Sequence, residues 1–182
     1  MKGTIFVELL HLIESEEGLD AVDHVIEASI DQLSTGGAYT AVGNYPHAEL
    51  LVLLGAYSQY IEANKRDGLL DRFAGYIIRE FGRLHPEFFE QSDLFALLES
   101  VESHIHEAVL RLYPEANPPN IACQRGEDSS LRVNYSSHRP LAEFALSLTR
   151  ESAKLFPTPA TIEVLSLADD GCTAEFVVRL QT

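Results

Sequence analysis

The chain has 182 residues, with thirteen lysines and arginines against twenty-eight aspartates and glutamates, which gives a formal net charge of −15 at pH 7. So few cations argue against a nucleic-acid-binding protein, because that binding depends on neutralising phosphates. Hydrophobic residues make up 46% of the chain and aromatic residues 9%, a composition typical of a globular protein. We therefore expect a single domain over residues 1–182, large enough to enclose a cofactor in one buried core.

Neither a secretory signal nor a membrane span is predicted. The N-terminal run begins Met-Lys-Gly and carries His11, Glu14 and Glu16 within one helix length, so it is amphipathic. No window approaches the roughly eighteen uninterrupted apolar residues that a membrane-spanning helix needs. We expect a cytoplasmic protein that does not cross a membrane and whose acidic surface suits protein partners.

The N-terminal half is predicted to be helical. Apolar residues recur at helical spacing over residues 2–15 and again over residues 19–33, and Gly36-Gly37 ends that region. After a loop around residues 43–46, further helices are expected at about 47–62, 67–84 and 86–91.

The C-terminal half mixes helices and strands. The expected elements are a helix at 93–112, a loop or short strand at 114–130, a strand at 131–138, a helix at 140–156, and two strands at 161–167 and 172–180. An Ala-Asp-Asp-Gly turn joins the last two strands as a hairpin. The predicted fold class is α+β, with a helical N-terminal half packed on an α/β C-terminal half that contains a small antiparallel sheet.

The helix predicted at residues 93–112 carries two histidines. In a regular helix His104 and His106 point about 200° apart, so they cannot bind one metal ion together. His106 lies on the side of Phe95 and Val109, which favours it as the histidine that faces an apolar pocket. The alternative is a half-buried histidine whose hydrogen bonds are satisfied within the protein.

Three hydrogen-bond donors follow one another at two-residue spacing in the strand predicted at 131–138. Alternate residues of a strand share a face, so Tyr135, Ser137 and Arg139 would stand at the end of an apolar strip formed by Leu131 and Val133. A phenol, a hydroxyl and a guanidinium together suit paired carboxylates of a flat apolar ligand. The alternative is an ordinary polar face of a sheet.

Several segments, in this order along the chain, resemble the heme nitric-oxide/oxygen-binding (H-NOX) family of sensor domains. They are Met1 to Phe6, Gly37 to Pro46, His106 followed by Tyr113-Pro114, then Pro118-Pro119, and finally Tyr135-x-Ser137-x-Arg139. The last motif alone is unspecific, but its position after the others makes the resemblance strong, and the resemblance covers essentially the whole chain.

The resemblance implies a cofactor and residues that hold it. The cofactor would be heme b (iron protoporphyrin IX), buried between a distal helical subdomain at about 1–65 and a proximal subdomain at about 66–182. His106 would be the axial ligand of the heme iron. Tyr135, Ser137 and Arg139 would bind the heme propionates.

The resemblance also assigns apolar residues to the heme pocket. Pro119 would press on the porphyrin edge, or simply stiffen a loop, and Ile5 would touch the heme, or simply lie in the core. Leu9 and Phe144 would line the gas-binding side, and Phe144 stands where family members that hold oxygen carry a tyrosine. We therefore expect binding of nitric oxide, and of CO, but poor binding of oxygen. Whether Tyr76 reaches this pocket is left open.

The implied function is heme-based gas sensing in signal transduction, not enzymatic catalysis. In the family mechanism, nitric oxide weakens the bond between the histidine and the iron. The signal would pass to a separate effector protein, by analogy a histidine kinase or a cyclic-di-GMP enzyme. Two alternatives remain open at this point: a heme-free protein-interaction module, and a heme protein that senses redox state or another gas.

Overall fold

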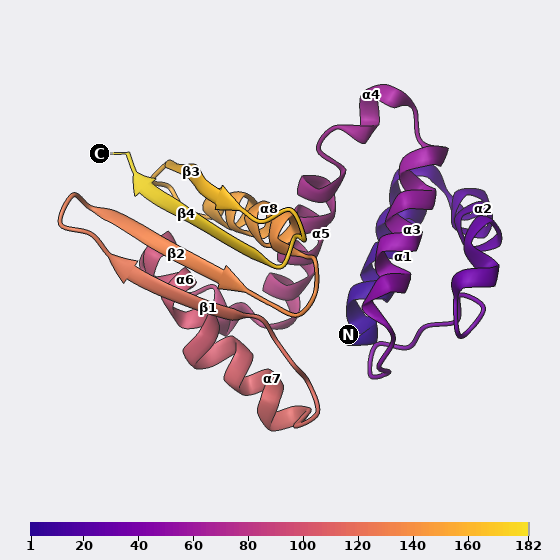
Figure 1. The fold of residues 1–182 in the computed structure, drawn as a ribbon, viewed down its shortest axis with the longest axis horizontal. Coiled ribbons are helices and arrows are strands. Elements are labelled where there is room, and N and C mark those ends of the chain that lie inside the picture. The colour runs from indigo at the N-terminus through magenta and orange to yellow at the C-terminus, as the bar shows by residue number, and fades with distance from the viewer. Residues whose placement is uncertain (182) are drawn as a thin grey trace. The chain divides into compact units, whose positions relative to one another are not determined.

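A computed structural model describes residues 1–181 (Figure 1). The chain forms two compact units, Met1–Ile77 and Ile78–Thr182, and the division between them falls inside the long helix α5 (Leu69–Leu84). The subdomain boundary expected near residue 65 stays a prediction. None of the helices in the described part of the chain is long and apolar enough to cross a membrane.

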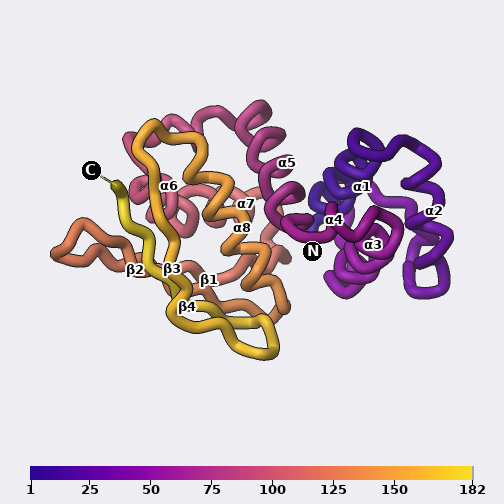
Figure 2. The backbone as a smooth tube through the Cα atoms, turned by 90° about the horizontal axis from the view of Figure 1, so that it is seen from above, coloured from indigo at the N-terminus to yellow at the C-terminus, as the bar shows by residue number. Residues whose placement is uncertain are grey.

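The first unit is helical, as predicted. Its elements are α1 (Gly3–Glu17), α2 (Leu19–Ser29), the short 3-10 helix η1 (Ile30–Gln32), α3 (His47–Tyr60), α4 (Ala63–Arg66) and the first part of α5. Helices α1, α2 and α3 pack side by side (Figure 2). The short helix α4 was not predicted.

Two segments singled out in the sequence lie against each other in this unit. The N–H of Gly3 donates to the carbonyl of Gly43 at 2.9 Å, and the N–H of Tyr45 donates to the carbonyl of Met1, also at 2.9 Å. A Cβ at position 3 would lie 1.9 Å from the Thr40 carbonyl oxygen, so only glycine allows this approach. The ring of Phe6 also stacks on Tyr39. These contacts fix the beginning of α1, the helix that carries Ile5 and Leu9.

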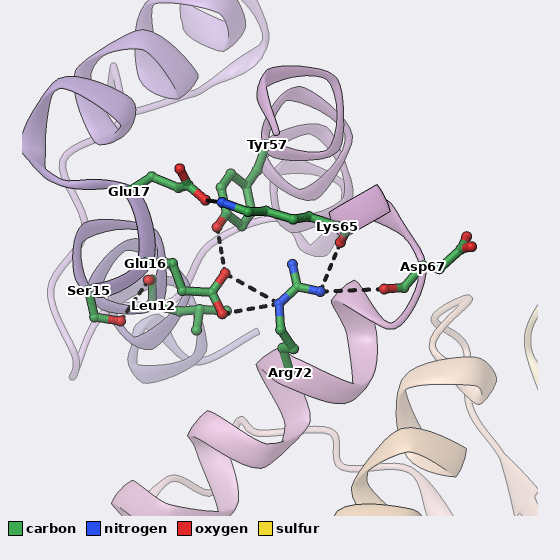
Figure 3. Close-up of polar contacts among 8 residues, drawn as sticks. All are labelled: Leu12, Ser15, Glu16, Glu17, Tyr57, Lys65, Asp67 and Arg72. Carbon is green, nitrogen blue, oxygen red and sulfur yellow. Dashed lines mark hydrogen bonds and ion pairs between the residues drawn. The ribbon is translucent and has the colours of Figure 1, made fainter. Parts of the chain in front are cut away.

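A polar cluster fastens the beginning of α5 to α1 and α3 (Figure 3). The carboxylate of Glu16 accepts the Tyr57 hydroxyl at 2.7 Å and the Arg72 Nε at 3.0 Å. Arg72 also donates through Nη1 to the carbonyl of Lys65 at 2.8 Å. Burial first, and then the hydrogen bond to Glu16, raise the pKa of Tyr57, so the phenol stays a neutral donor.

The second unit is built on a four-stranded antiparallel sheet in the order β1-β2-β4-β3. The strands are β1 (Asn120–Arg125), β2 (Ser130–Ser136), β3 (Ala160–Leu167) and β4 (Thr173–Leu180). Helices α6 (Leu94–Ser100) and α8 (Ala142–Ala153) pack on the same face of this sheet (Figure 1). Between them lies a core that includes Leu131, Val133, Tyr135, Phe176 and Val178. The α+β fold class and the final hairpin are confirmed.

The helix predicted at residues 93–112 is not regular. The structure has α6, then a π-helix, η3 (Val101–His106), then α7 (Glu107–Leu112). The hydroxyls of Ser100 and Ser103 donate to the carbonyls of Leu97 and Glu99. Such side-chain bonds compete with the regular backbone ladder and deform helices. The helix predicted at 86–91 is shorter too, a single 3-10 turn, η2 (Pro86–Phe88).

Candidate functional site

His106 is the last residue of η3, and its side chain is only 14% exposed. Its Nδ1 lies 3.0 Å from Oε2 of Glu102, four residues earlier. Among residues 1–181, Nε2 has no hydrogen-bond partner. One ring nitrogen is therefore held by the protein and the other is available to a ligand, which is the usual arrangement of a metal-binding histidine.

His104 lies in a different environment. It is exposed, and its Nδ1 lies 2.8 Å from the hydroxyl of the neighbouring Ser103. His106 is thus the less exposed of the two histidines. That it faces an apolar pocket stays a prediction, and the regular helix on which this prediction rested is replaced here by a π-helix. The role of His106 as an iron ligand stays a prediction too.

The structure adds Glu102, which the sequence analysis missed. The same Oε2 that faces His106 also accepts the backbone N–H of Ile121 at 3.2 Å. Ile121 lies on the edge strand β1 and pairs in register with Tyr135 of β2. The four-residue spacing between Glu102 and His106 was a visible signal, because such residues are neighbours on a helix.

Tyr135 is the last inward-facing residue of β2 and is 5% exposed. As predicted, Leu131 and Val133 are buried on the same face. The strand prediction was too long, however, because β2 ends at Ser136. Ser137 and Arg139 are therefore brought near Tyr135 by a turn and not by strand alternation.

In that turn, the Ser137 hydroxyl accepts the backbone N–H of Arg139 at 3.1 Å, a local bond typical of serine in turns. The Ser137 N–H donates to the carbonyl of Cys172, which anchors the turn to the start of β4. The guanidinium of Arg139 is half buried. It has no ion pair and no side-chain hydrogen bond to any residue of the described part of the chain.

The electrostatics of these residues favour an anionic ligand. Burial raises the pKa of Tyr135, and a hydrogen bond with Ser137 and the charge of Arg139 offset this only in part, so the phenol is a neutral donor. Burial also lowers the pKa of Arg139, yet an arginine side chain stays charged in proteins. A half-buried cation beside two neutral hydroxyl groups lacks a counter-charge.

The remaining predicted residues are apolar. Pro119 is partly buried just before β1, and Phe144 is buried in the first turn of α8. Ile5 and Leu9 lie one turn apart on α1, where Leu9 is fully buried and Ile5 partly buried. Of these four, Pro119 and Phe144 belong to the second unit, and Ile5 and Leu9 to the first.

A family model described as Haem-NO-binding matches residues 2–164. The chain belongs to this family. The family is that of the H-NOX proteins, whose members are heme-based gas-sensor domains. No curated protein matches the chain.

Solved H-NOX structures share the fold. The chain is 31% identical to an Fe(II) unliganded H-NOX protein from K. algicida, with a TM-score of 0.87 over 100% of this chain and 97% of that one. It is 34% identical to the IWP-051-bound H-NOX from Shewanella woodyi in the Fe(II)CO state, with a TM-score of 0.79 over 98% of this chain and 94% of that one. An H-NOX protein from S. oneidensis in the Fe(II)NO state is 21% identical, with a TM-score of 0.86 over 100% of both chains.

The residues of the second unit fit the cofactor that H-NOX proteins bind. A heme needs one strong axial donor from the protein, and it carries two carboxylates. Within the described residues, Nε2 of His106 has no partner, and Arg139, beside Tyr135 and Ser137, has no counter-charge. Membership of a heme-binding family does not favour the alternative of a heme-free interaction module.

Proposed function

We propose that this H-NOX protein is a sensor of nitric oxide that binds heme b through Nε2 of His106. When bound, the heme supplies a ferrous iron with one open position for a diatomic gas. His106 is suited to this role because Nδ1 interacts with Glu102 and the side chain is mostly but not completely buried. A neutral imidazole with one free nitrogen is a good iron ligand.

The observation that carries the proposal is that Arg139 has no carboxylate partner among the described residues. Its half-buried guanidinium faces no carboxylate among residues 1–181, while the hydroxyl groups of Tyr135 and Ser137 lie close by. Two propionates would neutralise this cation and accept charge-assisted hydrogen bonds, which are about twice as strong as neutral ones. In this proposal, Tyr135, Ser137 and Arg139 orient the heme, and Pro119 presses on its edge.

The preference for nitric oxide rests on three apolar side chains, those of Ile5, Leu9 and Phe144. None of them can donate a hydrogen bond to a bound gas. A donor at such a site contributes about 1.5–3 kcal/mol, or about ten- to a hundredfold in affinity, to the binding of oxygen. Nitric oxide and CO do not depend on such a donor. In this proposal, none of the three residues offers oxygen a donor, and nitric oxide and CO are therefore favoured.

The output passes to another protein in this proposal. The chain carries no nucleophile elbow or paired-carboxylate motif, so we assign it no enzymatic activity of its own. The partner would be a histidine kinase or a cyclic-di-GMP enzyme. The excess of acidic residues argues against nucleic acid as a partner. The cytoplasm stays the predicted location.

The direct test replaces His106 by glycine. We expect His106→Gly to lose most of its heme during purification and to recover it when free imidazole is added, because imidazole fills the space of the missing side chain. His104→Gly, two residues away and exposed, is the matched control and should bind heme normally. Absorption spectra of the ferrous proteins with nitric oxide, CO and air measure both coordination and selectivity. Unchanged heme content and nitric-oxide spectra in His106→Gly without imidazole would overturn the proposal.

A further inference from the structure

The carboxylate of Glu102 connects two parts of the second unit that are distant in sequence. It lies 3.0 Å from Nδ1 of His106 on its own helix and 3.2 Å from the backbone nitrogen of Ile121 on β1. Both contacts use the same oxygen, Oε2. Ile121 is on the edge strand, and its N–H is used by Glu102 and not by the sheet.

We propose that Glu102 is a positioning residue for the iron ligand, and this rests on the proposed function of His106. By accepting a hydrogen bond from the N–H at Nδ1, the carboxylate selects the tautomer of His106 in which Nε2 carries no proton. Only that nitrogen is then free to bind a metal. The contact also fixes the rotation of the ring about its bond to Cβ.

A carboxylate has a stronger effect here than a neutral acceptor would have. It raises the electron density of the imidazole, so that Nε2 becomes a better donor and its bond to iron becomes stronger. Losing such a partner typically weakens metal binding about ten- to a hundredfold. Glu102 would therefore set how firmly His106 holds the iron of a bound heme.

The bond to Ile121 gives this carboxylate a fixed position. The Glu102 side chain is 44% exposed, so without a second contact it would be free to turn into solvent. Because Ile121 is paired with Tyr135, the same two strands carry the contact that holds Glu102 and the phenol assigned to the propionates. The pair of strands β1 and β2 therefore positions both His106, through Glu102, and Tyr135.

A purely structural role for Glu102 makes a different prediction. An acidic residue four positions before a histidine stabilises a helix slightly, and a bond to β1 helps to dock the helix on the sheet. Glu99 serves as the matched control for both effects. It lies in α6 just before η3, and it binds Arg125 of β1 through two contacts of 2.8 Å without touching His106.

The experiment compares Glu102→Ala, Glu102→Gln and Glu99→Gln in the full-length heme-loaded protein. Resonance Raman spectra of the ferrous, gas-free protein give the iron–histidine stretching frequency. NMR spectra of the diamagnetic CO complex give the exchange rate of the His106 Nδ1 proton with water. We expect Glu102→Ala to lower the frequency, to accelerate the exchange and to weaken heme binding about ten- to a hundredfold.

Glu102→Gln keeps an acceptor oxygen but loses the charge, so its frequency should fall by less than that of Glu102→Ala. Glu99→Gln should match the wild type in both spectra. If Glu102→Ala does not fold, the Glu102→Gln frequency decides. The inference would be overturned if the folded Glu102 variants kept the iron–histidine frequency of the wild type and exchanged the His106 Nδ1 proton as slowly as the wild type does. Failure of the proposed function is a separate result, in which the wild type takes up no heme or His106→Gly holds heme normally.

Discussion

Glu49 of the first unit and Arg139 of the second unit are charged side chains removed from solvent that differ in their partners. In the first unit, the carboxylate of Glu49 is 3% exposed and accepts hydrogen bonds from Ser34 and Tyr39 at 2.7 Å each. The Glu16 carboxylate, which is more exposed, is shared between Tyr57 and Arg72 (Figure 3). In the second unit, Arg139 has no counter-charge among the described residues.

A charged group with partners inside the protein stabilises the fold, whereas a charged group without such partners is a candidate for binding a ligand. A buried charge with a complete set of partners is compatible with a stable protein, whereas one without a partner costs free energy in the absence of its ligand. In the first unit, both oxygens of the Glu49 carboxylate accept a hydrogen bond from within the protein. In the second unit, the guanidinium of Arg139 and Nε2 of His106 have no partner among the described residues, and we propose that a ligand supplies one.

The largest expected effect comes from removing the cation of the second unit. Arg139→Met should weaken heme binding about a hundredfold or more, because at least two charge-assisted bonds, each contributing about 1.5–3 kcal/mol, would be lost. Heme transfer to apomyoglobin measures this loss. The heme-free variant should be at least as stable to urea as the wild type, because an uncompensated charge has been removed.

Arg179→Met is the control for Arg139→Met, since Arg179 is exposed and pairs with Glu163 across the sheet at 2.8 Å. It should leave heme binding unchanged. If Arg139→Met kept wild-type heme affinity, or if its heme-free form were clearly destabilised, Arg139 would belong with the structural groups of the first unit and the comparison would fail.

The second prediction concerns a hydroxyl group that is added at position 144 and could donate a hydrogen bond to a bound gas. Phe144→Tyr should raise the affinity of the ferrous protein for oxygen about ten- to a hundredfold, because the new hydroxyl can donate to the bound gas. Titration of the ferrous protein with oxygen, followed by absorption, measures it. Phe144→Leu, which has no donor, is the control. An unchanged ferrous spectrum of Phe144→Tyr under air would count against Phe144 as a pocket residue.

The smallest effect is expected at the cluster of Glu49, Ser34 and Tyr39 in the first unit. Glu49→Gln should lower the free energy of unfolding by about 1–2 kcal/mol at neutral pH, because one oxygen that accepts a hydrogen bond becomes an amide donor facing Tyr39. Heme binding should not change. Urea unfolding at several pH values measures the effect, and Glu27→Gln on the exposed side of α2 is the control.

The same cluster predicts a pH dependence. Burial raises the pKa of Glu49, but its hydrogen bonds from Ser34 and Tyr39 outweigh this, and the net pKa lies below the ordinary carboxyl value. The group therefore stabilises the folded state above the pKa of the unfolded chain, and this contribution is lost as the pH falls through the folded pKa. Glu49→Gln should remove that part of the acid sensitivity. An identical pH profile in the variant and the wild type would contradict this assignment.

Much of the fold follows from local patterns in the sequence. Helical periodicity located α1, α2, α3 and α5, and alternation located β2, because one face of each element must be buried whatever it packs against. The order of the segments that resemble H-NOX proteins predicted the family. The residues assigned to the heme were found in the same way, and their roles stay predictions.

The sequence did not reveal the features that depend on contacts between distant segments. The π-helix η3 arises where serine hydroxyls compete for backbone carbonyls, an outcome that a periodic pattern does not show. For the segment that contains strand β1, the sequence left open a loop or a short strand, and the pairing with β2 decides for the strand. The end of β2 at Ser136 depends on where its pairing with β4 stops.

By itself, the sequence determined the fold class and the helical and alternating segments, because these depend on residue type and short-range spacing. The choice of His106 as a ligand stays a prediction. Only the tertiary structure decided that Glu102 lies between His106 and Ile121 and that Arg139 finds no counter-charge within residues 1–181. Hydrogen bonds and ion pairs act over a few ångströms. Which side chains come that close is decided by how helices and strands pack, not by their separation along the chain.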